Sequence, residues 1–521
     1  MQREKAVQAV AVIVVLTVAG KFLGFIREVI MASYFGAGAV TDAYLTSTLV
    51  IALILNMLGG RALGTALIPV YCEIAAAGAE ERAGKFAGTV LILTFIIFFA
   101  AALLGFAFAS LLVNATVPGL PAQTKGLAVH LTRLFMAGIP MLALGGVLAS
   151  LLNAHYSFAV PAALGIPHNL AIIGFVVFSG AGAVDGLAAG TLAGYLAQVL
   201  VTLPALKRKQ VRITGGLDCR EPGVARMGRL LLPVMAGGAV MQLNPLISRF
   251  LASGLPEGTI SALSYADRIV QVLLGLLVTA IITVSYPALS REFVRERRGN
   301  MAELINSWGG MLLFVTAPLA LAMASLSRPL VQVIYERGAF GSDAAGATAG
   351  ALLFYSLGLP FTALGRFFTR VFYIYHDSKT PVLISMAAVA INVMASLALV
   401  KPMGHCGLAL ASTISAAAGV PLSLVCLKAK TGPVFNRRMW KKVLLIISAL
   451  AAAALVMVVV SAAAGGAGKN GHRAGLLYLV LVGGAGMTAY FFSAHILKME
   501  EAVAVTATLK KVKIVLRRKV T

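Results

Sequence analysis

Residues 138–145 read GIPMLALG, and residues 358–365 read GLPFTALG, 220 positions later. Other segments recur in the same order at nearly the same spacing. At offsets of 221 and 222, the matching pairs are 186–188 with 407–409, Arg27 with Arg249, and Gly36 with Gly258. Three blocks in one order indicate a tandem duplication that covers most of the chain. Duplicated units of this size are common in membrane transporters.

The composition is that of a membrane protein. Hydrophobic residues make up 59% of the 521 positions, charged residues make up 12%, and the mean hydropathy is +0.91. Soluble domains carry roughly 25% charged residues, and a membrane helix needs about 20 apolar residues in a row. We therefore expect an all-α polytopic membrane protein with fourteen transmembrane helices. These lie near 7–34, 40–73, 84–113, 126–154, 159–181, 184–206, 225–252, 260–290, 303–327, 343–374, 380–400, 405–427, 441–464 and 474–497.

The basic residues show which loops face the cytoplasm. The net charge is +24, but the Lys and Arg residues cluster in alternate loops, at 207–229, 291–298 and 428–442. Such clustering follows the positive-inside rule and does not point to nucleic acid as a partner. It predicts a multi-pass membrane protein with both termini in the cytoplasm. The basic tail, 499–521, is expected to lie on anionic lipid or simply to fix the topology.

Topology and repeat together predict the domain organisation. Each repeated unit contains six helices, an even number, so both units enter the membrane in the same orientation. We expect an N-lobe at 1–210 and a C-lobe at 211–430, which includes the basic loop before it. Helices thirteen and fourteen, at 431–498, have no internal counterpart, and the tail at 499–521 follows them.

Several charges fall inside the predicted helices, where each costs about 2.5–3.5 kcal/mol on insertion scales. Basic groups outnumber acidic ones among them, which indicates a water-filled cationic cavity between the lobes and an anionic guest. Guanidinium groups suit phosphate in particular, because their fork matches it bidentately. The candidate residues are Lys21, Arg27, Asp42, Arg61, Arg249, Arg268 and Arg370.

Other polar residues have simpler explanations. We expect Arg133, Arg366 and Glu28 to reach the membrane interface with their polar ends. His168, with the other membrane-segment histidines, is interpreted as an interfacial or loop residue. Asn392 in the eleventh helix is interpreted as a hydrogen bond between helices. The four cysteines are scattered, so neither a disulfide framework nor a metal site is expected. No enzyme motif occurs, and neither a catalytic residue nor a cofactor is predicted.

Seven short segments together form a specific pattern: 21–27, 35–38, 41–44, 256–258, 265–268, 335–340 and 370–381. With these segments the chain resembles the MurJ (MviN) family of lipid II flippases, in the multidrug/oligosaccharidyl-lipid/polysaccharide exporter superfamily. The resemblance implies a place in the bacterial cytoplasmic membrane, a V-shaped cavity between two lobes and a groove to helices thirteen and fourteen for the polyprenyl tail. It also implies that Lys21, Arg27 and Arg268 are cavity cations and that Asp42 is the acidic residue at the entry of helix two.

The chain departs from this family in two places. The middle of helix two, where the family usually has basic residues and a glutamate, reads Leu55, Asn56 and Gly60, followed by Arg61. Some relatives bind sodium through acidic residues of helices seven and eleven. The nearest polar residues here are Asn392 and Ser396, and they are the candidates for an ion or polar site.

The resulting hypothesis is a flippase that moves lipid II from the inner to the outer leaflet by alternating access. Lys21, Arg27 and Arg268 would hold the diphosphate, Arg61 would replace the missing bases, and Asp42 would pair with the bases. Membrane potential or a monovalent cation would drive transport. The alternatives are a flippase for another polyprenyl-diphosphate glycan, a drug/cation antiporter, and a non-transporting scaffold for cell-wall synthesis enzymes.

Overall fold

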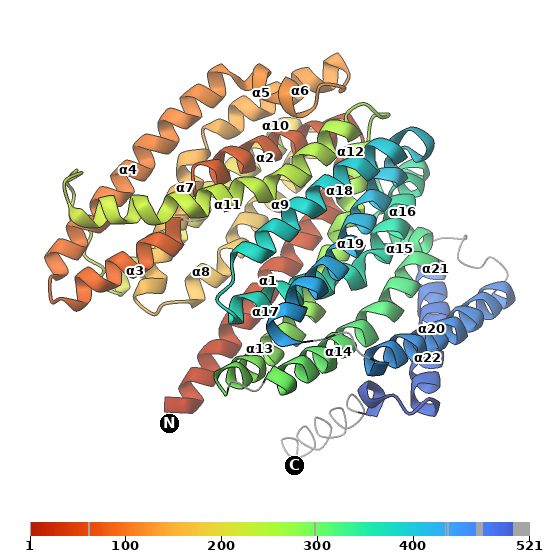
Figure 1. Cartoon of the computed structure of the whole chain (residues 1–521). Coiled ribbons are helices and arrows are strands. Elements are labelled where there is room, and N and C mark those ends of the chain that lie inside the picture. Colours follow the sequence, from red (N-terminus) through yellow and green to blue (C-terminus); the bar gives the residue numbers. More distant parts are fainter. Residues whose placement is uncertain are drawn as a thin grey trace, which may run out of the picture. The chain divides into compact units, whose positions relative to one another are not determined.

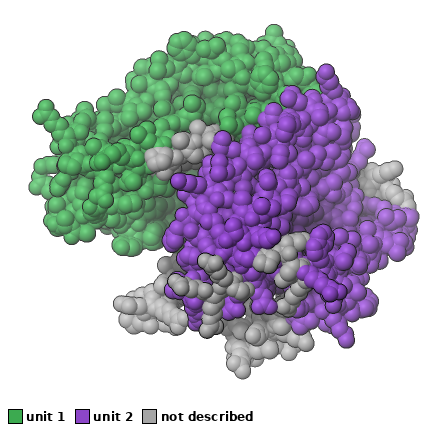
Figure 2. Space-filling model, viewed as in Figure 1, with its two compact units in different colours: residues 1–261, 337–341 green, residues 262–336, 342–521 purple. Residues whose placement is uncertain are grey.

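The computed structural model describes residues 2–60, 63–295, 298–432, 434, 437–464 and 472–503. Packing divides the chain into two compact units, coloured separately in Figure 2. Unit 1 comprises residues 1–261 and 337–341, and unit 2 comprises residues 262–336 and 342–521. Unit 1 extends past the lobe boundary predicted near residue 210 because the helix at Pro222–Ala252 packs against helices of the first half. The predicted lobes follow the sequence repeat, not the packing, and stay a prediction.

The described part of unit 1 consists of packed helices and their connections (Figure 1). They are α1 (Gln2–Phe35), α2 (Ala39–Met57), α3 (Leu63–Ala76), α4 (Glu80–Ala107), α5 (Ala109–Thr116), α6 (Ala122–Met136), α7 (Ile139–Ala154), α8 (Ala159–Ala163), α9 (Gly165–Ser179), α10 (Val184–Arg208) and α11 (Pro222–Ala252). Predicted helices two and three are each divided, into α2 with α3 and α4 with α5. Hydropathy does not reveal such divisions, because both parts are apolar.

Unit 2 contains the remaining helices. They are α12 (Thr259–Leu273), whose first turn belongs to unit 1, the π-helical turn η1 (Leu274–Val278), α13 (Thr279–Val294), α14 (Arg298–Ser325), α15 (Ser327–Tyr335), α16 (Ser342–Leu357), α17 (Leu359–Ile374), α18 (Lys379–Met403), α19 (His405–Thr431), α20 (Arg437–Ala463), α21 (His472–Tyr478), η3 (Leu479–Gly483) and α22 (Gly484–Ile496). Helices, turns and loops account for all described residues. The all-α polytopic fold is thus confirmed.

Ten helices in the described part are long and apolar enough to cross a membrane, or twelve if each of two bent pairs is one span. Helices α1 and α11 are not among them, and both contain positions whose side chains lie outside the description. The predicted number of fourteen transmembrane helices therefore stays a prediction.

The two copies of the repeated glycine–proline motif, at 138–145 and 358–365, lie at equivalent bends. In unit 1, α6 and α7 meet at 46° around Gly138, and in unit 2, α16 and α17 meet at 48° around Gly358. A proline follows each glycine within the first turn of the new helix, where its missing N–H group is not needed. The duplicated sequence thus produces the same bend twice.

The turn after each of these helices is also duplicated. Tyr156 and His376 both have a left-handed main chain, with φ of 55° and 54°. In unit 1 the amide of Ser157 donates to the carbonyl of Leu152 over 2.9 Å. In unit 2 the amide of Asp377 donates to the carbonyl of Phe372 over 3.0 Å. Both are six-residue helix-ending hydrogen bonds of the Schellman type.

The last described residues pack into unit 2. Met499 and Ala502 are buried in one apolar cluster with Phe314 of α14 and Tyr490 of α22. The Tyr490 hydroxyl donates to the Phe314 carbonyl over 3.0 Å. The basic tail predicted from residue 499 therefore begins with a packed segment, whereas the part from 504 onward lies outside the described residues.

Candidate substrate-binding site

Arg27 lies in α1 and forms a partly buried ion pair with the next residue. Its Nη2 is 2.5 Å from Oε1 of Glu28, and the two side chains are 15% and 7% exposed. The expectation that Glu28 reaches the membrane interface was wrong, since the carboxylate is buried beside Arg27. A charge enclosed at membrane depth requires a partner, and Glu28 supplies it.

Aromatic side chains of three helices interact with the Arg27 charge. The guanidinium interacts electrostatically with Tyr44 of α2 and Tyr195 of α10, and with His168 of α9. The rings of His168 and Tyr195 stack in parallel, with centroids 5.4 Å apart. Arg27 Nε is buried and has no hydrogen-bond partner among the described residues. The guanidinium thus keeps an unused donor beside three polar rings.

His168 is the residue that sequence reasoning missed at this position. It lies in the first turn of α9 and not in a loop. Helix α9 packs against α1 through glycines: a Cβ on Gly20 would lie 3.7 Å from the Cα of Gly165. This close packing agrees with the presence of small residues at helix interfaces in membranes. Only the closeness of α1 to α9 brings His168 near Arg27, and no sequence motif signals it.

Lys21 lies on α1, six residues before Arg27, and is exposed. Its ammonium makes no ion pair with any residue for which the structure gives a position. Glu28 is the acid that pairs with Arg27, so residues 21–28 of α1 contain two bases and one acid. The predicted cationic cavity between the lobes stays a prediction.

Asp42 is fully buried in the first turn of α2 and caps another helix. Oδ2 accepts a 2.7 Å hydrogen bond from the amide of Gly258, and Oδ1 accepts bonds from the amide (2.8 Å) and hydroxyl of Ser261. These amides are among the otherwise unpaired donors at the start of α12. The expected pairing with basic residues is not among these contacts. Asp42 therefore has a capping role, and its role as a substrate contact stays a proposal.

Two glycines near this cap allow main-chain segments to approach each other closely. Gly36 and Gly258 both have a left-handed main chain, with φ of 66° and 88°. A Cβ on Gly258 would lie 2.6 Å from the carbonyl oxygen of Ala37, and one on Gly36 would lie 2.5 Å from that of Ala339. Any other residue would force main-chain segments apart. The repeated glycine at offset 222 thus has the same structural reason in both copies.

Arg249 of α11, the counterpart of Arg27 in the repeat, is bonded differently. Its Nη1 donates to the carbonyl oxygen of Leu45 in α2. Leu45 has no side-chain charge, so this contact links two helices of unit 1 through the main chain. Arg249 therefore contributes to packing, whereas Arg27 keeps an unused donor.

In unit 2, the candidate bases lie on α12 and α17. Arg268 is exposed on α12, and the preceding Asp267 accepts a 3.1 Å hydrogen bond from Nε2 of Gln271. Gln271 Oε1 in turn accepts a 2.7 Å bond from Nη2 of Arg366. Arg370, one turn further along α17, lies 6.0 Å from the centre of the Tyr373 ring. A polar chain thus connects α12 to α17 within unit 2.

The candidate ion or polar site lies between α18 and α19. Asn392 Nδ2 donates to Ser412 Oγ over 3.3 Å, as expected for a hydrogen bond between helices. Asn392 Oδ1 and Ser396 Oγ are buried and have no partner in the described part of the chain. Within that part, no group of three or more His, Cys, Asp or Glu side chains is placed to hold a metal ion. Arg61 lies outside the described residues.

The comparisons with known proteins agree with this architecture. The family described as "Lipid II flippase MurJ" matches residues 31–471. The "Lipid II flippase MurJ" of Burkholderia cenocepacia is 30% identical over 415 residues, which cover 77% of this chain and 79% of that one. The "Probable lipid II flippase MurJ" of Thermotoga maritima is 28% identical over 485 residues, covering 92% and 94% of the two chains.

Solved structures show the same fold. A "Lipid II flippase MurJ, inward closed conformation" superimposes with a TM-score of 0.77 at 23% identity, covering 93% of this chain and 98% of that one. An inward-facing "multidrug resistance MATE family transporter of the MOP superfamily" gives 0.68 at 14% identity, covering 80% and 95%. The family match extends over most of the sequence and is supported by a 30% identical relative. The chain therefore belongs to the MurJ family of lipid II flippases.

Proposed function

We propose that this protein moves lipid II, a polyprenyl-diphosphate-linked cell-wall precursor, across the cytoplasmic membrane. Its relatives bear that activity in their names. The observation that carries the proposal is Arg27: a nearly enclosed guanidinium in the first helix that the sequence predicts to cross the membrane, with one acidic partner and an unused Nε–H among the described residues. Such a group suits an incoming phosphate, which accepts several charge-assisted hydrogen bonds.

In this proposal, Lys21, Arg27 and Arg268 bind the diphosphate. Arg61, Arg249 and Arg370 contribute positive charge, and Asp42 holds the start of α12 while the substrate passes. The head group crosses in water while the polyprenyl tail stays in lipid. This route avoids the many kcal/mol needed to bury phosphate charges in hydrocarbon. Alternating exposure to the two sides of the membrane would complete the cycle, as in other transporters with internal repeats.

The proposed driving force is the membrane potential. An anion that leaves a negative interior gains about 2.3 kcal/mol per charge per 100 mV. Flipping should therefore be faster in vesicles clamped inside-negative than in vesicles at zero potential, when the substrate starts on the inner leaflet. Equal rates at both potentials would eliminate this mechanism and favour a coupled monovalent cation, for which Asn392 and Ser396 offer two buried oxygens.

The proposed topology places both termini in the cytoplasm. It also places Cys72 and Cys219, which are both exposed, on the cytoplasmic side. A membrane-impermeant maleimide should label neither cysteine in intact cells and both in broken cells. Labelling of Cys219 in intact cells would show that the protein has the opposite orientation in the membrane.

The substrate is tested by reconstitution. Vesicles containing the purified protein should move lipid II to the opposite leaflet faster than empty vesicles do. A second lipid-linked glycan with the same diphosphate and an organic cation serve as competing substrates. If only the other glycan is transported, that glycan and not lipid II is the substrate. Transport of the cation alone would support a drug/cation antiporter instead.

A further inference from the structure

The segment 211–218, which connects α10 to α11, is held against α4 by its main chain. The amide of Thr214 donates to the carbonyl of Gly84 over 3.2 Å, and the amide of Asp218 donates to the hydroxyl of Thr89 over 3.2 Å. The segment contains neither helix nor strand, so its bonds to α4 fix its course. It is called the strap below.

Two glycines of α4 make room for the strap. A Cβ on Gly84 would lie 2.9 Å from the carbonyl oxygen of Arg212, and one on Gly88 would collide with the carbonyl oxygen of Thr214. A larger residue at either position would push the strap away from the helix. The close approach therefore depends on the sequence of α4 and not only on the length of the connection.

The strap covers the side of α4 that faces lipid further along the helix. Positions 84, 88, 95 and 99 lie on one face, because an α-helix has about 3.6 residues per turn. Phe95 and Phe99 are exposed, stack on each other and belong to the candidate span Glu80–Ala107. Apolar side chains that stay exposed in a membrane span are solvated by lipid tails. The strap therefore lies on the outer surface of unit 1 and not in its core.

The strap meets α4 at the level of the lipid head groups. All charged residues of α4 lie within 80–85, and the uncharged part, 86–107, is about 33 Å long. This length matches the hydrocarbon core of about 30 Å, which places Gly84 and Gly88 at one of its edges. The candidate span Val184–Arg208 ends just before the strap and indicates the same level.

The side chains of the strap suit an anionic membrane surface. Ile213 and Leu217 are large apolar side chains outside the candidate spans, yet they are 39% and 53% exposed. Apolar side chains gain by leaving water, and bases gain beside anionic lipid. Five exposed bases on or beside the strap make no ion pair with a described residue: Lys207, Arg208, Lys209, Arg212 and Arg220.

Acidic residues near the strap do not cancel this charge. Segments 73–85 and 207–229 together contain nine basic and five acidic residues. Three of these acids already pair with other bases of the same two segments. Arg212 interacts electrostatically with Glu81, but Glu81 is bonded to Lys85. The excess positive charge therefore falls on the strap and its ends.

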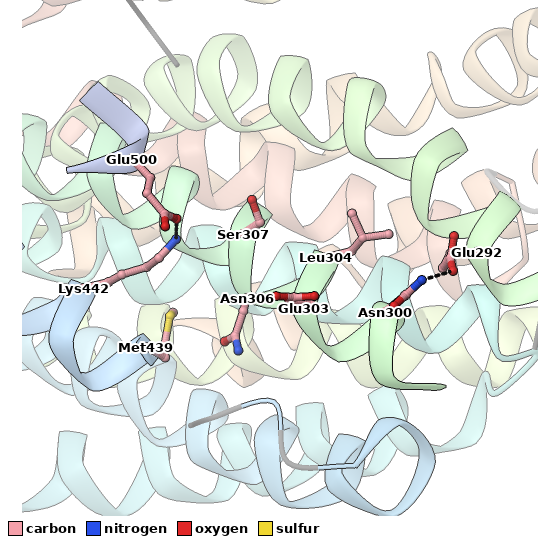
Figure 3. A pocket seen from close by; sticks show the side chains of 9 residues that line it. All are labelled: Glu292, Asn300, Glu303, Leu304, Asn306, Ser307, Met439, Lys442 and Glu500. Carbon is pink, nitrogen blue, oxygen red and sulfur yellow. Dashed lines mark hydrogen bonds and ion pairs between the residues drawn. The ribbon is translucent and has the colours of Figure 1, made fainter. Parts of the chain in front are cut away.

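Unit 2 shows the contrasting case, a polar pocket whose charged side chains have partners within the molecule (Figure 3). Lys442 Nζ lies 3.2 Å from Oε2 of Glu500. Asn300 Nδ2 donates to Oε1 of Glu292 over 2.9 Å. Charges paired in this way need no further partner. The strap bases have no ion-pair partner among the described residues, so they are available to an external anion.

We propose that the strap is an interfacial anchor in the head-group layer of one leaflet. Ile213 and Leu217 lie among the upper parts of the acyl chains, and the bases contact the phosphate groups of anionic phospholipids. A soluble polyanion would satisfy the bases but offers nothing to the two apolar side chains, which favours lipid as the partner. The proposed topology makes this the cytoplasmic leaflet, and the anchor does not depend on the transported substrate.

Tryptophan quenching by brominated lipid measures this contact in the purified full chain. Leu217→Trp and wild type, whose two native tryptophans give the baseline, are reconstituted in vesicles with increasing fractions of brominated phosphatidylglycerol or brominated phosphatidylcholine. The added fluorescence of Leu217→Trp should be lost, and half-maximal quenching should need less brominated phosphatidylglycerol than brominated phosphatidylcholine. Phe99→Trp, on the same face of α4, is the positive control and should be quenched by both lipids. No quenching of Leu217→Trp, or equal fractions of the two lipids, would overturn the proposal.

The bases are tested in the Leu217→Trp chain. Arg212→Gln and Arg220→Gln should each raise the fraction of brominated phosphatidylglycerol needed for half-maximal quenching by roughly fivefold, the effect of losing one base beside an anionic surface. Both side chains are exposed and outside any ion pair with described residues, so folding is preserved. Lys125→Gln removes an exposed positive charge at the start of α6 and should change nothing. An unchanged fraction in both strap variants would overturn the proposal.

Discussion

The turn after α7 in unit 1 and the turn after α17 in unit 2 have the same main-chain hydrogen bonds but different charges. Ser157 in the first turn is replaced by Asp377 in the second. The Asp377 carboxylate accepts bonds from the Thr380 hydroxyl (2.6 Å) and amide (3.0 Å), and lies 3.0 Å from Nζ of Lys430. The duplication thus preserved the main-chain geometry, while side-chain chemistry changed independently in each copy.

The same contrast holds for the arginines of the repeat. Arg27 pairs with a buried acid and retains an unused donor, whereas Arg249 donates to a main-chain carbonyl. Equivalent positions in the repeat therefore have different roles: Arg27 is proposed to bind the substrate, and Arg249 links two helices. The three pairs of substitutions and the single substitution below test how the two copies differ.

The largest effect is expected for Arg27→Ala. If Arg27 makes two hydrogen bonds to phosphate, its loss should slow lipid II flipping by roughly a hundredfold or more. Arg249→Ala should chiefly lower the unfolding temperature and leave most of the flipping rate per folded molecule. Flipping rates normalised to folded protein check both expectations. Equal losses of flipping in the two variants would show that the two arginines share one task.

The glycines that bring neighbouring helices together give the next largest effect. A Cβ on Gly407 would collide with the Leu399 carbonyl oxygen, and one on Gly186 with the Ser179 side chain. Overpacking costs about 1–3 kcal/mol. A main-chain carbonyl group, as at Gly407, can move aside less easily than a side chain, as at Gly186. Gly407→Ala should therefore destabilise the protein more than Gly186→Ala, as measured by thermal unfolding. The reverse order would argue against the helix contact described in unit 2.

Asp377→Ala should lower the free energy of unfolding by about 1 kcal/mol at neutral pH, the usual effect of losing a helix cap. The Thr380 hydroxyl, then its amide, then Lys430 hold the pKa of Asp377 well below its usual range. A lowered pKa means that this stabilisation is complete above the unfolded-state value, near 4, and is lost at lower pH. The difference between wild type and variant should therefore shrink only below about pH 4. A difference that shrinks between pH 8 and 6 would contradict this assignment.

The smallest effect concerns the two left-handed residues. Tyr156 and His376 bear a steric cost for their left-handed main chain, which glycine avoids. Glycine loses more conformational entropy on folding, which offsets part of this gain. Tyr156→Gly and His376→Gly should each stabilise the protein by about 0.5 kcal/mol. Thermal unfolding of the two variants measures this. Shifts of opposite sign would show that the two turns are not equivalent.

The sequence was sufficient for the helical membrane fold and the repeat, because long apolar runs and recurring glycines are local signals. It did not reveal the bends at Gly138 and Gly358, since hydropathy carries no information on main-chain direction. It also did not pair Arg27 with Glu28, because adjacent helical residues do not normally face each other.

Long-range contacts set a second limit. The carboxylate of Asp42 binds amides more than two hundred positions away, and nothing in the sequence near Asp42 specifies that partner. Residues that meet only through packing could not be recognised from spacing alone.

The central claim is that membrane-level bases, above all Arg27, bind the diphosphate of the substrate. Native mass spectrometry of wild type and Arg27→Gln with a polyprenyl diphosphate and the corresponding monophosphate tests it most directly. The account predicts that wild type retains the diphosphate lipid more strongly than the monophosphate, and that Arg27→Gln loses this preference. Equal retention of both lipids by wild type, or an unchanged preference in the variant, would contradict it.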